Sequence, residues 1–443
     1  MKPTYLPNLL ALAGAILLLH TTPTRADNLL DIYHQAETND TVWAGARYNY
    51  AASIEKGPQG RSLLLPSVIL SGGVFKNSID LIKPLSNTNR YDSSSYTVQL
   101  TQPLFRAQSF AAYAQGKSAV TQAEAELAIA RQDLILRTSQ AYFNVLSAED
   151  TLEFARSEKL AIAGQRELAE RNFNVGNATI VDVHEARSRY DLSMAQEVTA
   201  DNDLKVKQEA LSVLTNSPPP SLARLAPHLQ PQSPDPQDMQ HWVKAALDQN
   251  PRIRVQEQTL AIADEEVSRA RAGRYPTLDF VAAHNYTKSG NVYFPGILAY
   301  TSNQVGLQVQ VPLFAGGGIQ SKVRESLARE DQARQALEQA KRQTTQQSRA
   351  AYLAVTGGMA QVQALEQALI STQKALESTQ LGYETGVRTG VDVLNAQRDL
   401  YRTERDLAQA RYQYLLSRLQ LKYAVGTLNA ADVTELNGLL AGG

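Results

Sequence analysis

Two aspartates, Asp182 and Asp392, occupy the same place in two copies of one motif. FNVGNATIVDV begins at Phe173, and YETGVRTGVDV begins at Tyr383. A carboxylate at the start of a helix caps it, because negative charge is favourable there. An arginine such as Arg388, a carboxylate and a phenol can also hold two helices together reversibly, with about 1 kcal/mol from each exposed contact. The motif predicts polar contacts at helix ends, and both uses of the aspartates remain open.

The sequence holds no constellation typical of an enzyme or a metal site. It has no cysteine, which leaves out disulfides and zinc thiolates. Its six histidines are scattered, and His184-Glu185 lacks the second histidine of a zinc helix. Glycines 316–318 precede a helix like a phosphate loop, but no Gly-Lys-Ser/Thr follows, so we expect them to let a strand bend into a helix. We expect no catalytic residue, no metal, no cofactor and no enzymatic activity.

The two motifs belong to a duplication of the whole chain. Phe173 recurs as Tyr383 and Asp182 as Asp392 at a constant offset of 210 residues. Between the copies lies a stretch with seven prolines, which cannot continue a helix and predict an extended connector. The predicted units are a first repeat over 27–216, the connector over 217–237, a second repeat over 238–429 and a C-terminal segment over 430–443.

Each repeat contains one pair of predicted strands. In the second repeat Val305, Leu307 and Val309 alternate with glycine and glutamine. An apolar face and a glutamine-rich face suit a wall between lipid and water, although a soluble hairpin packed on helices would alternate too. Four strands cannot close a barrel, which takes about eight, so closure requires several chains. The predicted strands are about 63–75, 96–105, 277–287 and 304–314, with polar loops over 76–95 and 287–303.

The rest of each repeat is predicted to be long helix. Proline is absent from two stretches rich in Ala, Gln, Glu, Arg and Leu, and a helix of about 65 residues spans roughly 100 Å. Val393, Leu400 and Leu407 begin a seven-residue repeat, and a neighbouring row begins at Leu394. Two such rows are typical of coiled-coil packing against more than one helix. The predicted long helices are 107–171 and 319–381, with turns at about 172–180 and 382–390.

The N-terminal segment predicts export. Lys2, an apolar run over 9–19 and a small-x-small pattern ending at Ala26 fit a signal peptide over 1–26. The apolar run of about 11 residues is too short for a membrane anchor, which needs about 20. The net charge of −1 and the lack of a long basic stretch argue against nucleic acid as a partner. No later apolar run reaches the length of a membrane helix, so a membrane protein of this chain would have to be a β-barrel.

Several strings taken together resemble the TolC family of outer-membrane channel-tunnels over essentially the whole mature chain. They are DNLL from Asp27, LPS from Leu65, PLF from Pro103 and from Pro312, AYFNVL from Ala141, FNVG from Phe173, YPT from Tyr275, the motif from Tyr383 to Val393 followed by Leu394, and VGTLN from Val425.

The resemblance implies a fold and a setting. The fold is an all-α coiled-coil tunnel joined to a transmembrane β-barrel, in which a homotrimer completes 12 strands in outer-membrane lipid. The tunnel would extend into the periplasm of a bacterial cell and meet a periplasmic adaptor (membrane fusion) protein and an inner-membrane pump of the ABC or RND type. The implied function is an exit duct for type I protein secretion, for efflux of small toxic molecules, or for both. The alternative is a periplasmic coiled-coil adaptor, which would normally have one hairpin rather than a duplicated pattern.

The resemblance also implies roles for residues at the two turns. Asp392 matches an aspartate that faces the lumen, so three-fold symmetry would gather three carboxylates at one constriction, where they attract cations. The family often has a second acidic position, which is Asn395 here, and this departure halves the expected charge of the ring. Asp182, Tyr383 and Arg388 match positions that hold the closed state through contacts between neighbouring helices.

The tips of the turns are implied docking points for the adaptor. Glycine permits the positive φ of a tight turn, so Gly176 and Gly386 have a structural reason of their own. The resemblance adds adaptor docking at Val175, Gly176 and Asn177 in the first turn and at Thr385, Gly386 and Val387 in the second.

Overall fold

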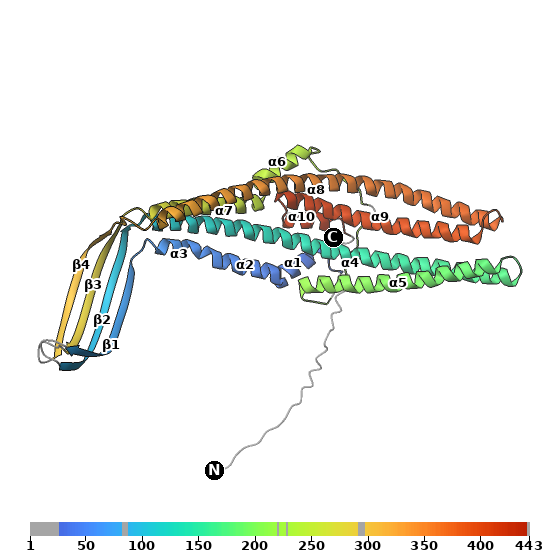
Figure 1. Ribbon diagram of the computed structural model, residues 1–443. Helices are drawn as coiled ribbons and strands as arrows, with labels where there is room; N and C mark the ends of the chain where they lie inside the picture. The colour runs from blue at the N-terminus through green and yellow to red at the C-terminus, as the bar shows by residue number, and fades with distance from the viewer. Residues whose placement is uncertain (1–25, 82–86, 219–220, 227–228, 291–296, 441–443) are drawn as a thin grey trace, which may run out of the picture.

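The chain forms a sheet at one end of a bundle of long helices (Figure 1). The computed structural model describes residues 26–81, 87–218, 221–226, 229–290 and 297–440, so the predicted signal peptide lies outside them except for Ala26. In chain order the elements are α1 (Leu29–Asn39), α2 (Thr41–Ile54), α3 (Lys56–Ser62), β1 (Ser67–Leu81), β2 (Asn87–Phe105), α4 (Ala107–Asn174), α5 (Ile180–Thr215), α6 (Met239–Gln249), α7 (Pro251–Ala272), β3 (Thr277–Gly290), β4 (Ile297–Gln310), α8 (Gly318–Glu384), α9 (Gly390–Val425) and α10 (Ala430–Asn437).

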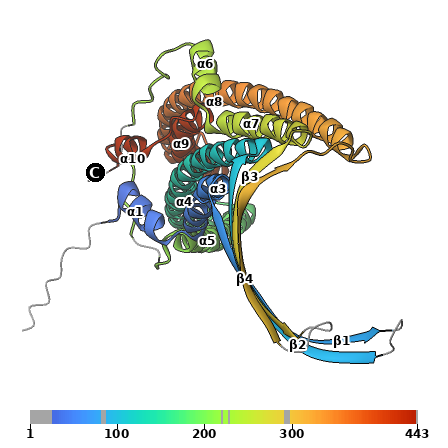
Figure 2. The ribbon, with the colours of Figure 1, turned by 90° about the vertical axis from the view of Figure 1, so that its left-hand side faces the viewer.

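The four strands form one antiparallel sheet in the order β1-β2-β3-β4. Successive side chains of a strand point to opposite faces. One cross-strand row consists of Val68, Leu100, Ala282 and Val305, and the next row consists of Ile69, Gln99, Ala283 and Gln304. The predicted alternation therefore produces one apolar face and an opposite, more polar face, on which glutamines lie beside Ile69 and Ala283. Figure 2 shows that the sheet curves away from the helix bundle along its length.

The strands extend further into the predicted loops than the sequence suggested. The observed strands are Ser67–Leu81, Asn87–Phe105, Thr277–Gly290 and Ile297–Gln310. The corresponding predicted strands are about 63–75, 96–105, 277–287 and 304–314. Most of the predicted loop over 76–95 is therefore paired strand. Serine and asparagine suggested a loop there, but in the sheet their side chains pair across strands, as where Asn77 Nδ2 donates to Ser93 Oγ over 2.8 Å. Residues 82–86 and 291–296 of the predicted loops lie outside the described residues.

Helices α4 and α8 run without a break from the sheet to the far end of the bundle (Figure 1). Before α8, Gly316 and Gly317 adopt φ of 57° and 80°, a region that glycine enters without steric cost, and this lets the chain turn from sheet to helix. The predicted heptad rows are largely buried where α9 packs on α8 and α4: Val393, Leu407, Tyr414, Leu421, Leu394 and Leu415. No helix in the described part of the chain has an apolar stretch sufficient to span a membrane.

The main core lies about midway along the bundle, where the short helices and the connector wrap around the long ones. Its largest fully buried side chains include Tyr142 and Phe143 of α4 and Tyr414 of α9. Tyr142 Oη donates to the carbonyl of Ala223 in the connector over 2.6 Å, and this bond ties the extended connector to α4. The connector prolines 219, 220 and 227 lie outside the described residues.

Candidate functional site at the helix-turn-helix tips

Two tight turns end the helix bundle at the side opposite the sheet (Figure 1). One joins α4 to α5 and the other joins α8 to α9. Gly176 and Gly386 adopt φ of 80° and 77° at the same place in each turn, so both glycines are required by the backbone. The proposed docking residues on either side of these glycines are all exposed: Val175, Asn177, Thr385 and Val387. The turns therefore present small exposed tips at the end of rigid helices.

The two motif aspartates cap the helices that follow the turns. Asp182 Oδ2 accepts from the Thr179 backbone N–H over 2.9 Å, and the Asp182 N–H donates back to Thr179 Oγ1 over 3.3 Å. Asp392 forms the same reciprocal pair with Thr389, at 2.9 and 3.2 Å. This arrangement is a capping box, which satisfies two backbone donors at the helix start. The Thr389 backbone N–H and then its hydroxyl, with a smaller contribution from the Arg388 charge, hold the pKa of Asp392 below its usual range.

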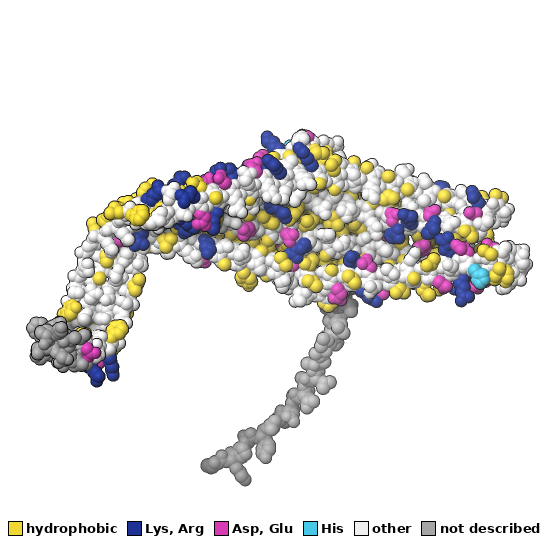
Figure 3. Space-filling model, viewed as in Figure 1, with side chains coloured by type: hydrophobic (Ala, Val, Ile, Leu, Met, Phe, Trp, Pro, Cys, Tyr) yellow, Lys and Arg dark blue, Asp and Glu magenta, His cyan; other side chains and the backbone are white. Residues whose placement is uncertain are grey.

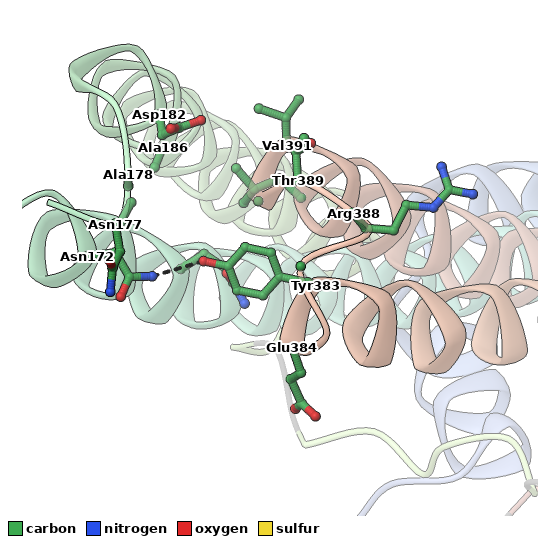
Figure 4. A pocket seen from close by; sticks show the side chains of 15 residues that line it. Asn172, Asn177, Ala178, Asp182, Ala186, Tyr383, Glu384, Arg388, Thr389 and Val391 are labelled. Carbon is green, nitrogen blue, oxygen red and sulfur yellow. Dashed lines mark hydrogen bonds between the residues drawn. The ribbon is translucent and has the colours of Figure 1, made fainter.

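Tyr383 reaches from one hairpin to the other. Its hydroxyl accepts from Nδ2 of Asn172 over 3.0 Å, which links the end of α8 to the end of α4 (Figure 4). Both residues line a cavity of about 620 Å³ between the tips, and Asp182, Glu384 and Arg388 line it too. The tyrosine therefore contacts the other hairpin through Asn172, a residue that the resemblance did not single out.

Arg388 lines the same cavity, with its side chain directed away from Asp182 (Figure 4). Its backbone N–H donates to the carbonyl of Gly382 over 3.0 Å. A Cβ added at Gly382 would lie 2.7 Å from Cγ of Arg388, so the glycine leaves room for the arginine stem. Within the described residues no hydrogen bond or ion pair joins Arg388 to Asp182 or to Tyr383. A single chain brings the three predicted residues to one cavity but not into direct contact.

Asn395 makes a second polar contact between the hairpins. Nη2 of Arg189 on α5 donates to Asn395 Oδ1 on α9 over 3.3 Å, and Nε of the same arginine donates to Glu185 over 2.9 Å. A small apolar cluster lies beside this contact, where Ile162, Ala186 and Leu394 pack together from α4, α5 and α9. Asn395, which departs from the second acidic position of the family, therefore accepts from a cation of the other hairpin.

Sequence reasoning missed Asn172 and Arg189. The duplication gave no indication of them, because residues 210 positions later are Gly382 and Asp399, which have different chemistry. Both missed residues contact the other repeat, so their partners are 211 and 206 residues away. Within the described residues no group of three or more His, Cys, Asp or Glu side chains is placed to hold a metal ion.

Comparison with known sequences identifies relatives of the whole chain. The sequence model described as "Outer membrane efflux protein" matches residues 32–217 and 242–427, one match in each repeat. Outer membrane protein TolC of Vibrio cholerae is 34% identical over 414 residues, which cover 93% of this chain and 93% of that protein. Alkaline protease secretion protein AprF of Pseudomonas aeruginosa is 30% identical over 431 residues, covering 95% of this chain and 89% of that protein.

Solved structures share the fold at lower identity. The CmeC outer membrane channel of Campylobacter jejuni matches with a TM-score of 0.79 and 17% identity, over 94% of this chain and 90% of that one. The outer membrane protein VceC of Vibrio cholerae matches with a TM-score of 0.77 and 18% identity, over 90% of this chain and 96% of that one. Matched in both repeats and related to TolC over most of its length, the chain belongs to the outer membrane efflux protein family, as its sequence strings predicted.

Proposed function

We propose that this protein is an outer-membrane exit duct that receives its cargo from an inner-membrane pump through a periplasmic adaptor. One observation carries the proposal. In a single duplicated chain, a sheet with an apolar and a more polar face is joined directly to two long helical hairpins. The sheet suits a membrane wall, and the hairpin tips lie at the opposite end (Figure 1). Two relatives that match nearly the whole chain are named outer membrane protein TolC, which disfavours a periplasmic adaptor.

The two unpaired edges of the described sheet support an assembly of three chains, because they can pair with the edges of neighbouring chains. In the described sheet β1 and β4 each have a strand neighbour on one side only. Four strands are about half of the smallest closed barrel, so one chain cannot enclose an interior. If β4 of each chain pairs with β1 of the next, three chains give 12 strands, with apolar faces toward lipid and polar faces toward a lumen.

The cargo is a secreted protein, small toxic molecules, or both. A clean deletion, complemented with the intact gene as control, is scored in parallel for proteins exported to the medium and for tolerance of detergents, dyes and antibiotics. We expect the loss of one secreted protein with unchanged drug tolerance for a dedicated type I duct, and broad hypersensitivity for a shared efflux exit. Unchanged export together with unchanged tolerance would refute the proposed function.

The entrance to the duct is proposed to lie at the tips. Three-fold assembly would gather three copies of Asp392 at one constriction, and such a ring favours cations. Asn395 in place of a second carboxylate makes this ring weaker. The closed-state latch is proposed to include Tyr383 with Asn172, and Asn395 with Arg189, within one chain. Asp182 and Arg388 line the same cavity without contacting each other. Their part in the latch is therefore proposed to consist of contacts with neighbouring chains of the trimer.

Adaptor docking at the tips is proposed for both turns and is best tested at Val387. Gly386 has a φ of 77°, so a bulky side chain there would combine bulk with backbone strain. Val387 is 80% exposed and has no such constraint. We expect Val387→Trp to reduce export to the level of the deletion, while Val387→Ala exports normally and both variants reach the outer membrane in equal amount. Normal export by Val387→Trp would count against docking at this tip.

A further inference from the structure

The apolar face of the sheet changes in character along the strands. Near the helices it carries apolar rows, with Phe280 beside Leu307 and Leu100 beside Ala282 and Val305. Further from the helices comes an aromatic row, in which Tyr96 pairs with Tyr286 and the two rings stack with centroids 5.3 Å apart. In a membrane sheet an apolar band of about 25 Å ends in an aromatic girdle at the interface with the headgroups. From Leu278 to Tyr286 the strand covers roughly 26 Å at about 3.3 Å per residue. Within this length the row of Val98 includes the polar side chains of His284 and Asn303, which lie 2.6 Å apart (Nδ1 to Oδ1) and so satisfy each other.

Cationic side chains follow directly beyond the aromatic row, on the same face. Lys288 lies two residues past Tyr286, Lys76 four residues past Gly72 (which pairs with Tyr96), and Arg90 six residues before Tyr96. The register confirms the shared face: Lys288 pairs with Ser94, Lys76 with Asp92 and Arg90 with Ser78. All three cations are exposed. Lys and Arg side chains accordingly gather at this end of the sheet (Figure 3).

Two acids lie on the same face, Asp92 between the strands that carry Lys76 and Lys288, and Asp80 at the end of β1. No ion pair within 4 Å involves any of the three cations in the described part of the chain. Lys76 and Arg90 are diagonal neighbours on adjacent strands, roughly 7–8 Å apart at that position, so their long side chains can converge on one anion. The three cations therefore remain available for a ligand outside the protein.

We propose that Lys76, Arg90 and Lys288 bind the phosphates of lipid headgroups in the outer leaflet, with Lys76 and Arg90 on one phosphate and Lys288 on another. The inference rests on the proposed insertion of this sheet in the outer membrane. An apolar band, then stacked tyrosines, then cations is the order in which a sheet would meet hydrocarbon, the interface and the phosphates of the headgroups. Lysine and arginine side chains can bend back toward the interface while their charge stays at the phosphate level. The cluster thereby fixes the depth of each chain in the membrane as well as binding the lipid.

The test uses the purified full-length protein in a non-ionic detergent, titrated with diphosphorylated lipid A while bound lipid is counted by native mass spectrometry. We expect the triple variant Lys76→Gln, Arg90→Gln, Lys288→Gln to lose roughly 100-fold in affinity. The charge-matched control Lys322→Gln, Arg329→Gln, Lys374→Gln alters only exposed positions of α8 and should bind like the wild type. Dephosphorylated lipid A should bind the wild type as weakly as phosphorylated lipid A binds the triple variant, and inorganic phosphate at the same concentration should not compete.

Equal affinity of the triple variant and the wild type would overturn the proposal, and so would equal binding of dephosphorylated lipid or competition by inorganic phosphate. Single variants Lys76→Gln and Lys288→Gln, each expected to lose several-fold, replace the triple variant if it does not fold. Conductance measured in bilayers of phosphate-free lipid distinguishes a failure of the proposed headgroup site from a failure of the proposed duct. A triple variant that conducts but binds lipid A like the wild type refutes only the headgroup site, whereas a wild type without conductance refutes the proposed duct.

Discussion

We expect the double variant Arg189→Ala, Tyr383→Phe to raise single-channel conductance several-fold in planar bilayers. The two hydrogen bonds it removes, from Arg189 to Asn395 and from Asn172 to Tyr383, both join the α4–α5 hairpin to the α8–α9 hairpin. A hydrogen bond of this kind contributes about 1 kcal/mol, and 1.4 kcal/mol is a factor of ten. The loss of both should therefore shift the ratio of closed to open states by more than about tenfold in each chain. Phenylalanine keeps the ring in the cavity and removes only the hydroxyl.

The matched control is Arg187→Ala. Arg187 is exposed on the same helix, two residues before Arg189, and no hydrogen bond or ion pair is described for it. Its removal takes away the same charge without a contact between hairpins, so its conductance should equal that of the wild type. Arg189 also donates to Glu185 over 2.9 Å, and Glu185→Gln measures the weakening of that contact alone. Equal conductance of the double variant and the wild type would show that these contacts do not hold the entrance closed.

Asn395→Asp, measured in the same bilayers, is expected to change conductance in the opposite direction. A carboxylate would form an ion pair with Arg189, whose charged guanidinium now donates to a neutral amide oxygen. The added coulombic attraction should lower conductance. The carboxylate would also restore the second charge of the proposed ring beside Asp392 and raise the preference for cations. Adding Arg189→Ala to Asn395→Asp separates the two effects. Conductance should recover while the cation preference stays high.

The features that the sequence predicted correctly are local ones. Alternation from Val305 to Val309 is a property of adjacent residues, so it placed the two faces of the sheet without knowledge of the partner strand. The absence of proline from α4 and α8 and the heptad row through Val393 and Leu407 are local in the same sense. The repeated motif located both turns, because glycine followed by a Thr-x-x-Asp capping box has a fixed spacing.

The features that the sequence did not predict depend on distant residues. The outer part of the sheet is rich in serine, threonine and asparagine, which suggested loops. In the fold the partner strand supplies hydrogen bonds to these residues, such as the 2.8 Å bond from Asn77 Nδ2 to Ser93 Oγ. The contacts of Asn172 and Arg189 cross from one repeat to the other, so neither motif copy contains both partners. Aspartates 182 and 392 fit both the cap and the latch in sequence, and the geometry of one chain shows the cap.

Arg137→Ala is expected to have the largest effect on stability, about 3–5 kcal/mol of destabilisation. The Arg137 guanidinium binds both carboxylate oxygens of Asp40, at 2.9 and 3.1 Å, and so ties the junction of α1 and α2 to α4. Asp40 is only 3% exposed, and it also accepts from the Trp43 backbone N–H over 2.6 Å to cap α2. Removal of the arginine leaves an uncompensated buried carboxylate. Asp133→Asn, which removes the charge of a half-exposed partner of the same arginine, should cost less than about 1 kcal/mol.

A double-mutant cycle in thermal melts distinguishes the charge effect from lost packing. Asp40→Asn keeps a capping side chain but removes the charge, so Asp40→Asn with Arg137→Ala should melt above Arg137→Ala alone. If the double variant melts at or below the melting temperature of Arg137→Ala, the loss of stability comes from packing instead.

The stability of the Asp40–Arg137 contact should depend on pH. Burial raises the pKa of Asp40, but the hydrogen bonds from Arg137 and Trp43 outweigh this effect, so the net pKa is lowered. A depressed pKa contributes stability above the unfolded value of about 3.9 and loses it as pH falls through the folded value. Without Arg137 the buried carboxyl gains by protonation, so the difference between variant and wild type should narrow between pH 7 and about pH 4.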